Sequence, residues 1–169
     1  SYTAEKILIA VGGTPQLLDV PGMAEHAITS NEALDLTSRP QHIIIYGSGY
    51  IALEFAGIFA GFGSEVHLVY RSDLPLRGFD EDIREMIAPA LEERGVILHS
   101  GRIISKIEPE GSSYQVTFDD GITMQTDKVM AATGRRPNII GLGLEELGIV
   151  IDKKGAVRVD EHSRTSAQS

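Results

Sequence analysis

The 169-residue chain contains no cysteine and no tryptophan. The absence of cysteine excludes a disulfide framework and any metal site built on thiolates. Histidine does not fill that gap, because the five histidines show neither metal-ligand spacing nor pairing with a nucleophile. They are His26, His42, His67, His99 and His162. No metal site is therefore predicted.

Long apolar runs and an excess of positive charge are also missing. No run of about 18 apolar residues occurs, which argues against a membrane-spanning helix. The net charge of −9 argues against nucleic acid or an anionic membrane as the partner. Residues 1–6 lack the basic-then-apolar layout of a secretory signal, and we expect a cytoplasmic location. Apolar residues make up 42% of the chain, enough for the core of one domain with parts of a neighbour.

A glycine-rich turn is the most informative feature that is present. The apolar run 43–46 leads into Gly47-Ser48-Gly49-Tyr50-Ile51-Ala52, which opens a segment with helical periodicity. A strand, a glycine turn and a helix N-terminus direct backbone N–H groups at one point, which suits a pyrophosphate. Glycine turns before helices are common, so a structural role is equally open for the motif alone. Its place in a βαβ unit of the expected length favours a dinucleotide.

Two arginines follow the next apolar run. An NAD site places Asp or Glu against the ribose 2′-hydroxyl about twenty residues after the glycines. Here the run 65–70 ends in Arg71, and Arg77 lies one loop further. Either could be an exposed surface charge, but together they fit a 2′-phosphate, which a carboxylate would repel. The pattern predicts an NADPH site.

Tyr50 and Glu54 lie four residues apart on the first helix, near its phosphate end. From the residues alone, Tyr50 is equally a half-buried packing residue and Glu54 equally a surface charge that complements the helix dipole.

The periodicity predicts an α/β fold: a Rossmann-like, doubly wound βαβ sheet with an antiparallel β-meander as a crossover. Helices are expected at 31–36, 49–62, 80–94 and 144–147. Parallel strands are expected at 42–46, 65–70, 96–99 and 128–132, and the meander at 103–129. Further strands are expected at 3–13, as a buried strand, and near 157–159.

Three sequence runs carry a family resemblance: GSGYIALEFAGIF, LVYRSDLPLRGFD and AATGRRPN. Their order and spacing closely resemble the NADPH-binding domain of the glutathione reductases, a group of the FAD-dependent pyridine nucleotide–disulfide oxidoreductases. The resemblance covers essentially the whole chain. It implies a homodimeric parent enzyme that passes hydride from NADPH to FAD and then electrons through a cysteine pair to a disulfide.

The resemblance also implies roles for single residues. Tyr50 corresponds to a mobile lid over the nicotinamide, and Glu54 to a carboxylate near the carboxamide. Arg71 and Arg77 correspond to the pair that holds the 2′-phosphate. Further contacts to NADPH are implied for Gly47, Ser48, Gly49, Ile51, Gly134 and Arg135, and contacts to FAD for Val11, Gly12 and Gly13. Val11 departs from the more usual threonine.

Because the chain has no cysteine pair and no N-terminal flavin motif, we expect a catalytically incompetent fragment of a larger enzyme. Residues 1–10 would be an edge of the flavin domain, 11–146 the NADPH-binding domain and 147–169 a segment returning to the flavin domain. The flavin and interface domains of the parent would be its partners.

Alternatives remain at this stage. They are a trypanothione reductase-like enzyme, a stand-alone NADPH-sensing module, and a methyltransferase that binds S-adenosylmethionine, in which the arginines would have no phosphate to hold. A lipoamide dehydrogenase-like enzyme is disfavoured, because an acid is expected where Arg71 stands.

Overall fold

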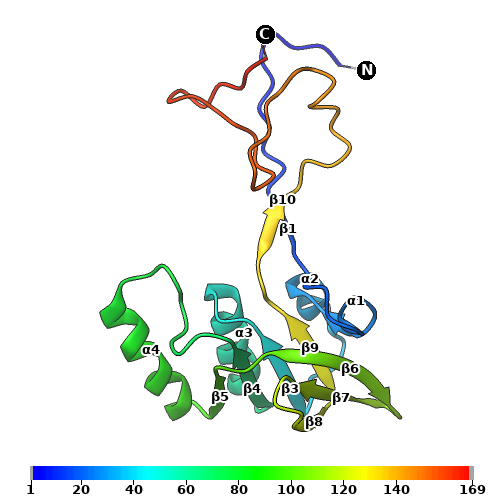
Figure 1. Ribbon diagram of the computed structural model, residues 1–169, viewed down its shortest axis with the longest axis vertical. Coiled ribbons are helices and arrows are strands. Elements are labelled where there is room, and N and C mark those ends of the chain that lie inside the picture. The colour runs from blue at the N-terminus through cyan, green and yellow to red at the C-terminus, as the bar shows by residue number, and fades with distance from the viewer. Residues whose placement is uncertain (1, 168–169) are drawn as a thin grey trace. The chain divides into compact units, whose positions relative to one another are not determined.

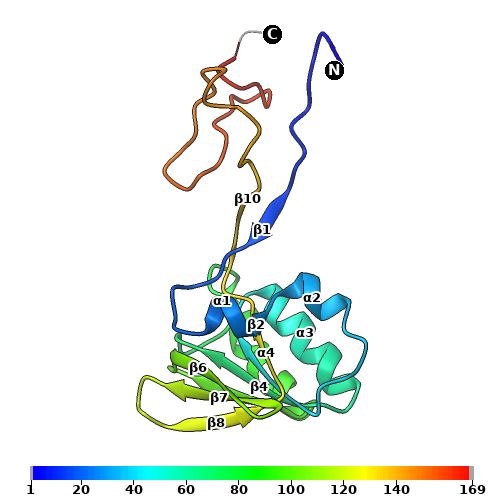
Figure 2. The same cartoon turned by 90° about the vertical axis from the view of Figure 1, so that its right-hand side faces the viewer.

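The computed structural model describes residues 2–167, which form two compact units (Figures 1 and 2). The larger unit is Pro15–Gly134. The smaller unit combines the described residues up to Thr14 with those from Arg135 onward. The expected boundaries after residues 10 and 146 assign functional domains, and that assignment stays a prediction.

The larger unit is built on a five-stranded parallel sheet in the order β2-β9-β3-β4-β5. Its strands are β2 (Ala27–Ile28), β3 (His42–Tyr46), β4 (Glu65–Tyr70), β5 (Val96–Ser100) and β9 (Lys128–Ala131). The four longer strands confirm the sequence prediction. The edge strand β2 was not predicted, since two residues are too few to show a pattern of alternation.

Helices cover one face of this sheet. They are α2 (Ser30–Leu34), α3 (Tyr50–Gly61) and α4 (Glu81–Glu93); the short α1 (Met23–His26) lies on the other face. Ile43 and Ile45 of β3 pack against Ala52, Ala56 and other apolar residues of α3. Asp80 caps α4 by accepting a hydrogen bond from the backbone amide of Asp82. No helix within residues 2–167 is both long and apolar enough to cross a membrane.

An antiparallel meander covers the opposite face (Figure 2). Its strands are β6 (Ile104–Glu110), β7 (Ser113–Phe118) and β8 (Thr123–Thr126). Ile44 and Tyr46 point to this side and pack with Val116 and Phe118. Because β3 is buried on both faces, it reads in the sequence as a continuous apolar run. The α/β sheet with a meander crossover is confirmed.

The smaller unit corrects three predictions. Residues 3–12 form no strand, and Ile7 and Leu8 are 81% and 87% exposed, so the predicted buried strand is wrong. Residues 144–147 form a turn and not a helix. Near 157–159 a single bridge joins Ile151 and Val157. An apolar run becomes a strand only where another strand can pair with it, and the described residues offer none to 3–12.

The structure also contains a two-stranded ribbon of β1 (Gly13–Pro15) and β10 (Arg135–Pro137), which was not predicted from the sequence. Its strands are three residues long and stand far apart in the chain. Neither strand has the alternating pattern of a half-buried strand, so periodicity alone could not pair them.

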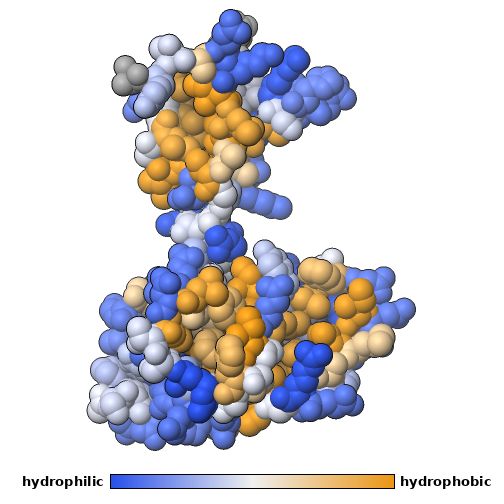
Figure 3. All heavy atoms as spheres, turned by 180° about the vertical axis from the view of Figure 1, so that it is seen from behind, coloured by the Kyte–Doolittle hydropathy of each residue, from blue (hydrophilic) through white to orange (hydrophobic). Residues whose placement is uncertain are grey.

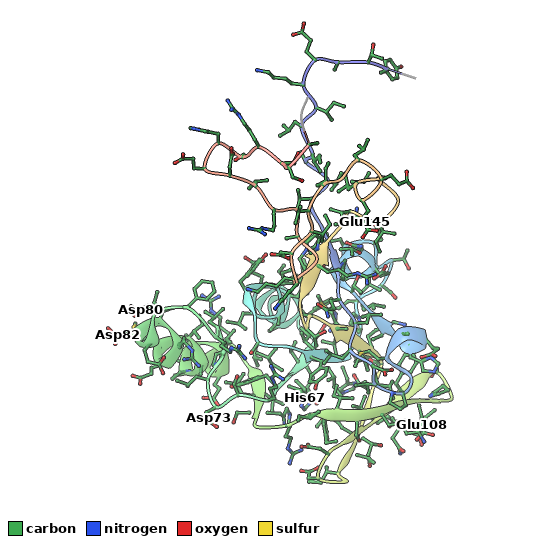
Figure 4. The ribbon with its side chains drawn as sticks, turned by 45° about the horizontal axis from the view of Figure 1, so that its top comes forward. His67, Asp73, Asp80, Asp82, Glu108 and Glu145 are labelled. Carbon is green, nitrogen blue, oxygen red and sulfur yellow. The ribbon has the colours of Figure 1, made fainter. Side chains whose placement is uncertain are left out.

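Three titratable side chains form a row along β4 and β5. His67 Nε2 lies 2.9 Å from Glu65 Oε1, and His67 Nδ1 lies 2.9 Å from His99 Nε2. The two histidine rings stack, and His99 also stacks on Phe118. Burial lowers the pKa of His99, and positive charge on His67 and Arg102 lowers it further. The fold therefore favours a neutral His99; Figure 4 shows His67 on β4.

Lowering the pH is expected to destabilise the protein through His99. In the unfolded chain this imidazole takes up a proton near its ordinary pKa of about 6.5, while the folded state resists it. Stability should therefore fall as the pH drops below about 6.5. Urea unfolding at about pH 7.5 and about pH 5.5 measures the loss, which His99→Gln should reduce. A matched control is His162→Gln, at an exposed histidine; an equal reduction in both variants would contradict the assignment to His99.

Candidate functional site

The carboxyl ends of β9, β3 and β4 meet at one edge of the parallel sheet. Tyr46, the last residue of β3, is in register with Ala131 on one side and Val69 on the other. The residues that follow these strands are therefore neighbours. They include Gly47, Arg71 and Gly134, for which the family resemblance implies contacts to one nucleotide.

Gly47 is required by backbone packing. Its φ of 137° disfavours any other residue, and a Cβ there would lie 2.3 Å from the carbonyl oxygen of Ala132. The Gly47 amide donates to the Val69 carbonyl at 2.9 Å, and the Ala132 amide to the Tyr46 carbonyl at 2.8 Å. The glycine at 47 therefore lets the ends of β3 and β9 approach closely, which brings the first glycine motif (residues 47–52) into contact with the second, the segment Thr133-Gly134 after β9.

Gly49 has a different role. Its φ of −77° suits any residue, and a Cβ would meet no atom within 4 Å. It is the N-cap of α3, a helix with no side-chain cap and no acid in its first turn. By contrast, α4 is capped by Asp80 and has two acids in its first turn. The N-terminus of α3 thus combines open space, free amide donors and a positive dipole end, which fits an anion.

The other predicted residues of this turn lie on or near α3. Tyr50 is 54% exposed, Glu54 is exposed, and Ile51 is half-buried. Ala52 is fully buried and allows the close packing expected from the sequence. Exposure leaves Tyr50 and Glu54 accessible to a ligand. Their roles as lid and carboxamide partner stay predictions.

Arg71 and Arg77 are both exposed at the same edge. Within residues 2–167 neither takes part in a salt bridge, whereas Arg84 pairs with Glu81 and Arg102 with Asp120. Arg71 lies close enough to β3 to influence Tyr46. Burial raises the pKa of Tyr46, and a hydrogen bond with the Ile104 backbone and the positive charge of Arg71 oppose that rise. The charge of Arg71 thus acts at the Tyr46 hydroxyl, on the meander face of the sheet.

Gln16 joins the second glycine motif and was not singled out in the sequence. The backbone amide of Gln16 donates to the Gly134 carbonyl at 2.9 Å, and the backbone carbonyl of Gln16 accepts from Thr133 Oγ1 at 2.8 Å. Gly134 has a φ of 143°. The contact joins segments more than a hundred residues apart, so no local pattern could reveal it.

The remaining predicted residues lie in the smaller unit. The Arg135 guanidinium donates to the Gly13 carbonyl, and the backbone amide of Asn138 donates to the Gly12 carbonyl at 3.0 Å. Gly12 has a φ of 66° with no atom within 4 Å of a Cβ position, and Val11 is 40% exposed. The structure therefore groups Gly12, Gly13 and Arg135. Whether they contact FAD and nicotinamide stays a prediction.

A polar cleft lies at the other edge of the sheet. It is lined by residues at the starts of β3, β4 and β7 and at the end of β8: Gln41, His42, Glu65, Ser113, Gln125, Thr126 and Asp127. It is thus separate from the glycine turn. Among residues 2–167, no group of three or more His, Cys, Asp or Glu side chains could hold a metal ion.

Comparison with known proteins identifies the protein family to which the chain belongs. A family model described as pyridine nucleotide-disulphide oxidoreductase matches residues 1–169. The chain belongs to this family.

Individual relatives match most of the chain. A glutathione reductase from Nostoc sp. is 44% identical over 177 residues, which cover 98% of this chain and 38% of the relative. A trypanothione reductase from Trypanosoma congolense is 44% identical over 168 residues, covering 96% and 34%. The solved HOCl-induced flavoprotein disulfide reductase RclA from Escherichia coli is 33% identical, with a TM-score of 0.89 over 96% of this chain and 38% of that one. The chain thus spans little more than a third of these proteins' lengths.

The two glycines of the turn should respond differently to alanine. Gly47→Ala forces a Cβ against the Ala132 carbonyl at an unfavourable φ and should lower the unfolding free energy by at least about 2 kcal/mol. Gly49→Ala has room and ordinary backbone angles, so stability should change little. Chemical denaturation compares the variants, and similar losses in both would contradict the distinct roles assigned to these glycines.

Proposed function

We propose that the chain provides the NADPH-docking domain of a flavoprotein disulfide reductase of the glutathione reductase type. The observation that carries the proposal is the pair Arg71 and Arg77, exposed and without salt bridges in the described chain, after the second strand of the βαβ unit. In an NAD site this position would carry an acid. Here a 2′-phosphate can accept charge-assisted hydrogen bonds from two guanidinium groups.

The residues at the edge fit the rest of the nucleotide. The pyrophosphate would lie over Gly47, Ser48 and Gly49, where the open space at Gly49 meets the amide groups of α3. Tyr50, Ile51, Glu54 and Gly134 would form the nicotinamide side. NADPH supplies a hydride, and FAD in the complete enzyme would accept it. The chain's own task is to bind and orient the donor.

The smaller unit supports a role within a larger enzyme. Figure 3 shows apolar side chains gathered on one face of this unit. The most exposed aliphatic side chains of the unit are those of Ile7, Leu8, Ile140 and Leu147. An apolar surface of this kind calls for cover by other protein. We assign the cover to the flavin domain of the parent enzyme, with Val11, Gly12 and Gly13 at the flavin. In a stand-alone NADPH sensor, no flavin domain would cover this surface.

The disulfide has two candidates. Glutathione reductases and trypanothione reductases are 44% identical to this chain, and glutathione is the substrate we propose. NADPH oxidation by the full-length enzyme, measured with glutathione disulfide and with trypanothione disulfide, distinguishes them. Faster turnover of trypanothione disulfide would replace the first candidate by the second.

Charge reversal at Arg71 tests the nucleotide assignment. Calorimetric titration at matched ionic strength should show a clear preference of the wild-type protein for NADPH over NADH. Arg71→Glu should weaken NADPH binding by about tenfold or more, because it replaces a charge-assisted hydrogen bond by repulsion. Binding of NADH should change little.

The matched control for that test is Arg94→Glu. Arg94 is an exposed arginine at the far end of α4, before β5 begins. Equal loss of both nucleotides in Arg71→Glu, or equal effects of Arg71→Glu and Arg94→Glu, would contradict a 2′-phosphate site.

Filling the open space at Gly49 tests the pyrophosphate assignment separately. Gly49→Val should weaken NADPH and NADH alike by at least about tenfold, because the side chain occupies the place of a group that both nucleotides share. Gly61→Val is the control, at a glycine of the same helix that also has open space around it. Unchanged affinity in Gly49→Val would place the pyrophosphate elsewhere.

A further inference from the structure

The loop between β4 and α4 is fastened to the glycine turn by its backbone. The Leu76 amide donates to the carbonyl of Ser48 at 2.8 Å. Arg77 is the next residue. The position of the Arg77 backbone relative to the turn that would hold the pyrophosphate is therefore set by this bond.

Leu76 itself has an unusual conformation. Its φ is 53°, and within residues 2–167 the only other non-glycine residue with a positive φ is Ser163. The Leu76 side chain is nevertheless 7% exposed and packs in the core on the helical side of the sheet. A leucine stays in this strained region only where surrounding contacts hold it there. Contacts to Leu76 and to the residues before it are therefore needed to keep Leu76 in this conformation.

Arg84 supplies the contacts on the preceding residues. From the first turns of α4, its Nε donates to the Pro75 carbonyl at 2.9 Å and its Nη2 to the Leu74 carbonyl at 3.3 Å. Its Nη1 donates to Glu81 at 2.6 Å. The side chain is 18% exposed. Ser72 Oγ reinforces the loop by donating to the Leu74 carbonyl at 2.8 Å.

These bonds separate Arg84 from the two arginines assigned to the nucleotide. All three guanidinium nitrogens of Arg84 already donate to oxygen atoms of the protein. Arg71 and Arg77 are exposed and have no salt bridge in the part of the chain that is described. In Figure 4, Asp73 marks the loop, and Asp80 and Asp82 mark the start of α4. Arg84 thus joins α4 to the loop between β4 and α4.

We propose that Arg84, acting through Leu74, Pro75 and Leu76, is a positioning residue that sets the selectivity for NADPH over NADH. The inference rests on the proposed nucleotide site. An arginine on a loose loop must be ordered when the phosphate binds, and that ordering costs affinity. A loop held by Arg84 at Leu74 and Pro75, and by Ser48 at the Leu76 amide, presents Arg77 in place before binding. NADH lacks the 2′-phosphate and gains nothing from this order.

The experiment compares NADPH and NADH affinities of the purified protein by titration calorimetry. Arg84→Met keeps the apolar stem and removes every donor. It should weaken NADPH binding by about tenfold and leave NADH binding within about twofold. Arg39→Met is the matched control, since Arg39 also donates to a backbone carbonyl, that of Gly63 at 2.7 Å, at the opposite edge of the sheet. It should leave the selectivity unchanged.

A second variant separates position from charge. Arg84→Lys keeps the positive charge but cannot reproduce a planar fork that reaches two carbonyls and Glu81 together. It should recover only a small part of the selectivity. Full recovery would mean that the charge of Arg84 attracts the phosphate, which would overturn the positioning role. Leu76→Gly, which accepts the positive φ but loses the buried side chain, should also reduce selectivity.

The outcomes distinguish the two levels of the proposal. A wild-type protein without preference for NADPH would overturn the proposed site and the role of Arg84 with it. A wild-type preference that survives both Arg84→Met and Arg84→Lys would overturn the role of Arg84 alone. Equal losses for NADPH and NADH in Arg84→Met would show general damage to the fold and would likewise overturn it.

Discussion

The close backbone contact between Gly47 and Ala132 is the constraint on which the nucleotide edge depends. The Ala132 carbonyl occupies the place that a side chain at position 47 would need. This contact brings the first glycine motif beside the second, although the two are far apart in the chain. The open space above Gly49 and the uncapped start of α3 lie next to it. Gly47 therefore has a structural role, whereas Gly49 is suited to ligand binding.

Most of the larger unit could be predicted from the sequence. Strands β3, β4, β5 and β9 are four to six residues long, with mainly apolar sequences bounded by turn residues, and α3 and α4 have clear starts. In parallel sheets such runs are buried on both faces, so their sequence signal is strong. The predicted site residues at Gly47, Gly49 and Arg71 follow directly from those strands. Their placement at one edge is a consequence of parallel topology.

The rest could not be predicted because its causes are not local. The run at 3–12 has strand-like composition, but no described strand pairs with it, and it remains exposed. Gln16 and Arg84 act through bonds to backbone carbonyls, which any residue type can offer. The positive φ of Leu76 falls on a residue that normally avoids it. Sequence patterns identify the groups that could bind a nucleotide, but not the bonds that hold those groups in position.

The order of strands in the sheet has a consequence for the making of the protein. β9 lies between β2 and β3, yet it is the last of the five strands to be synthesised. Until it inserts, β3 has no neighbour on that side, and the Ala132 carbonyl that meets Gly47 is missing. Pairing of segments so distant in sequence is slow, because a long loop must close first. The edge that we assign to NADPH is thus complete only once β9 has inserted, and a nascent chain that stops before β9 would present the glycine turn without Ala132 beside it.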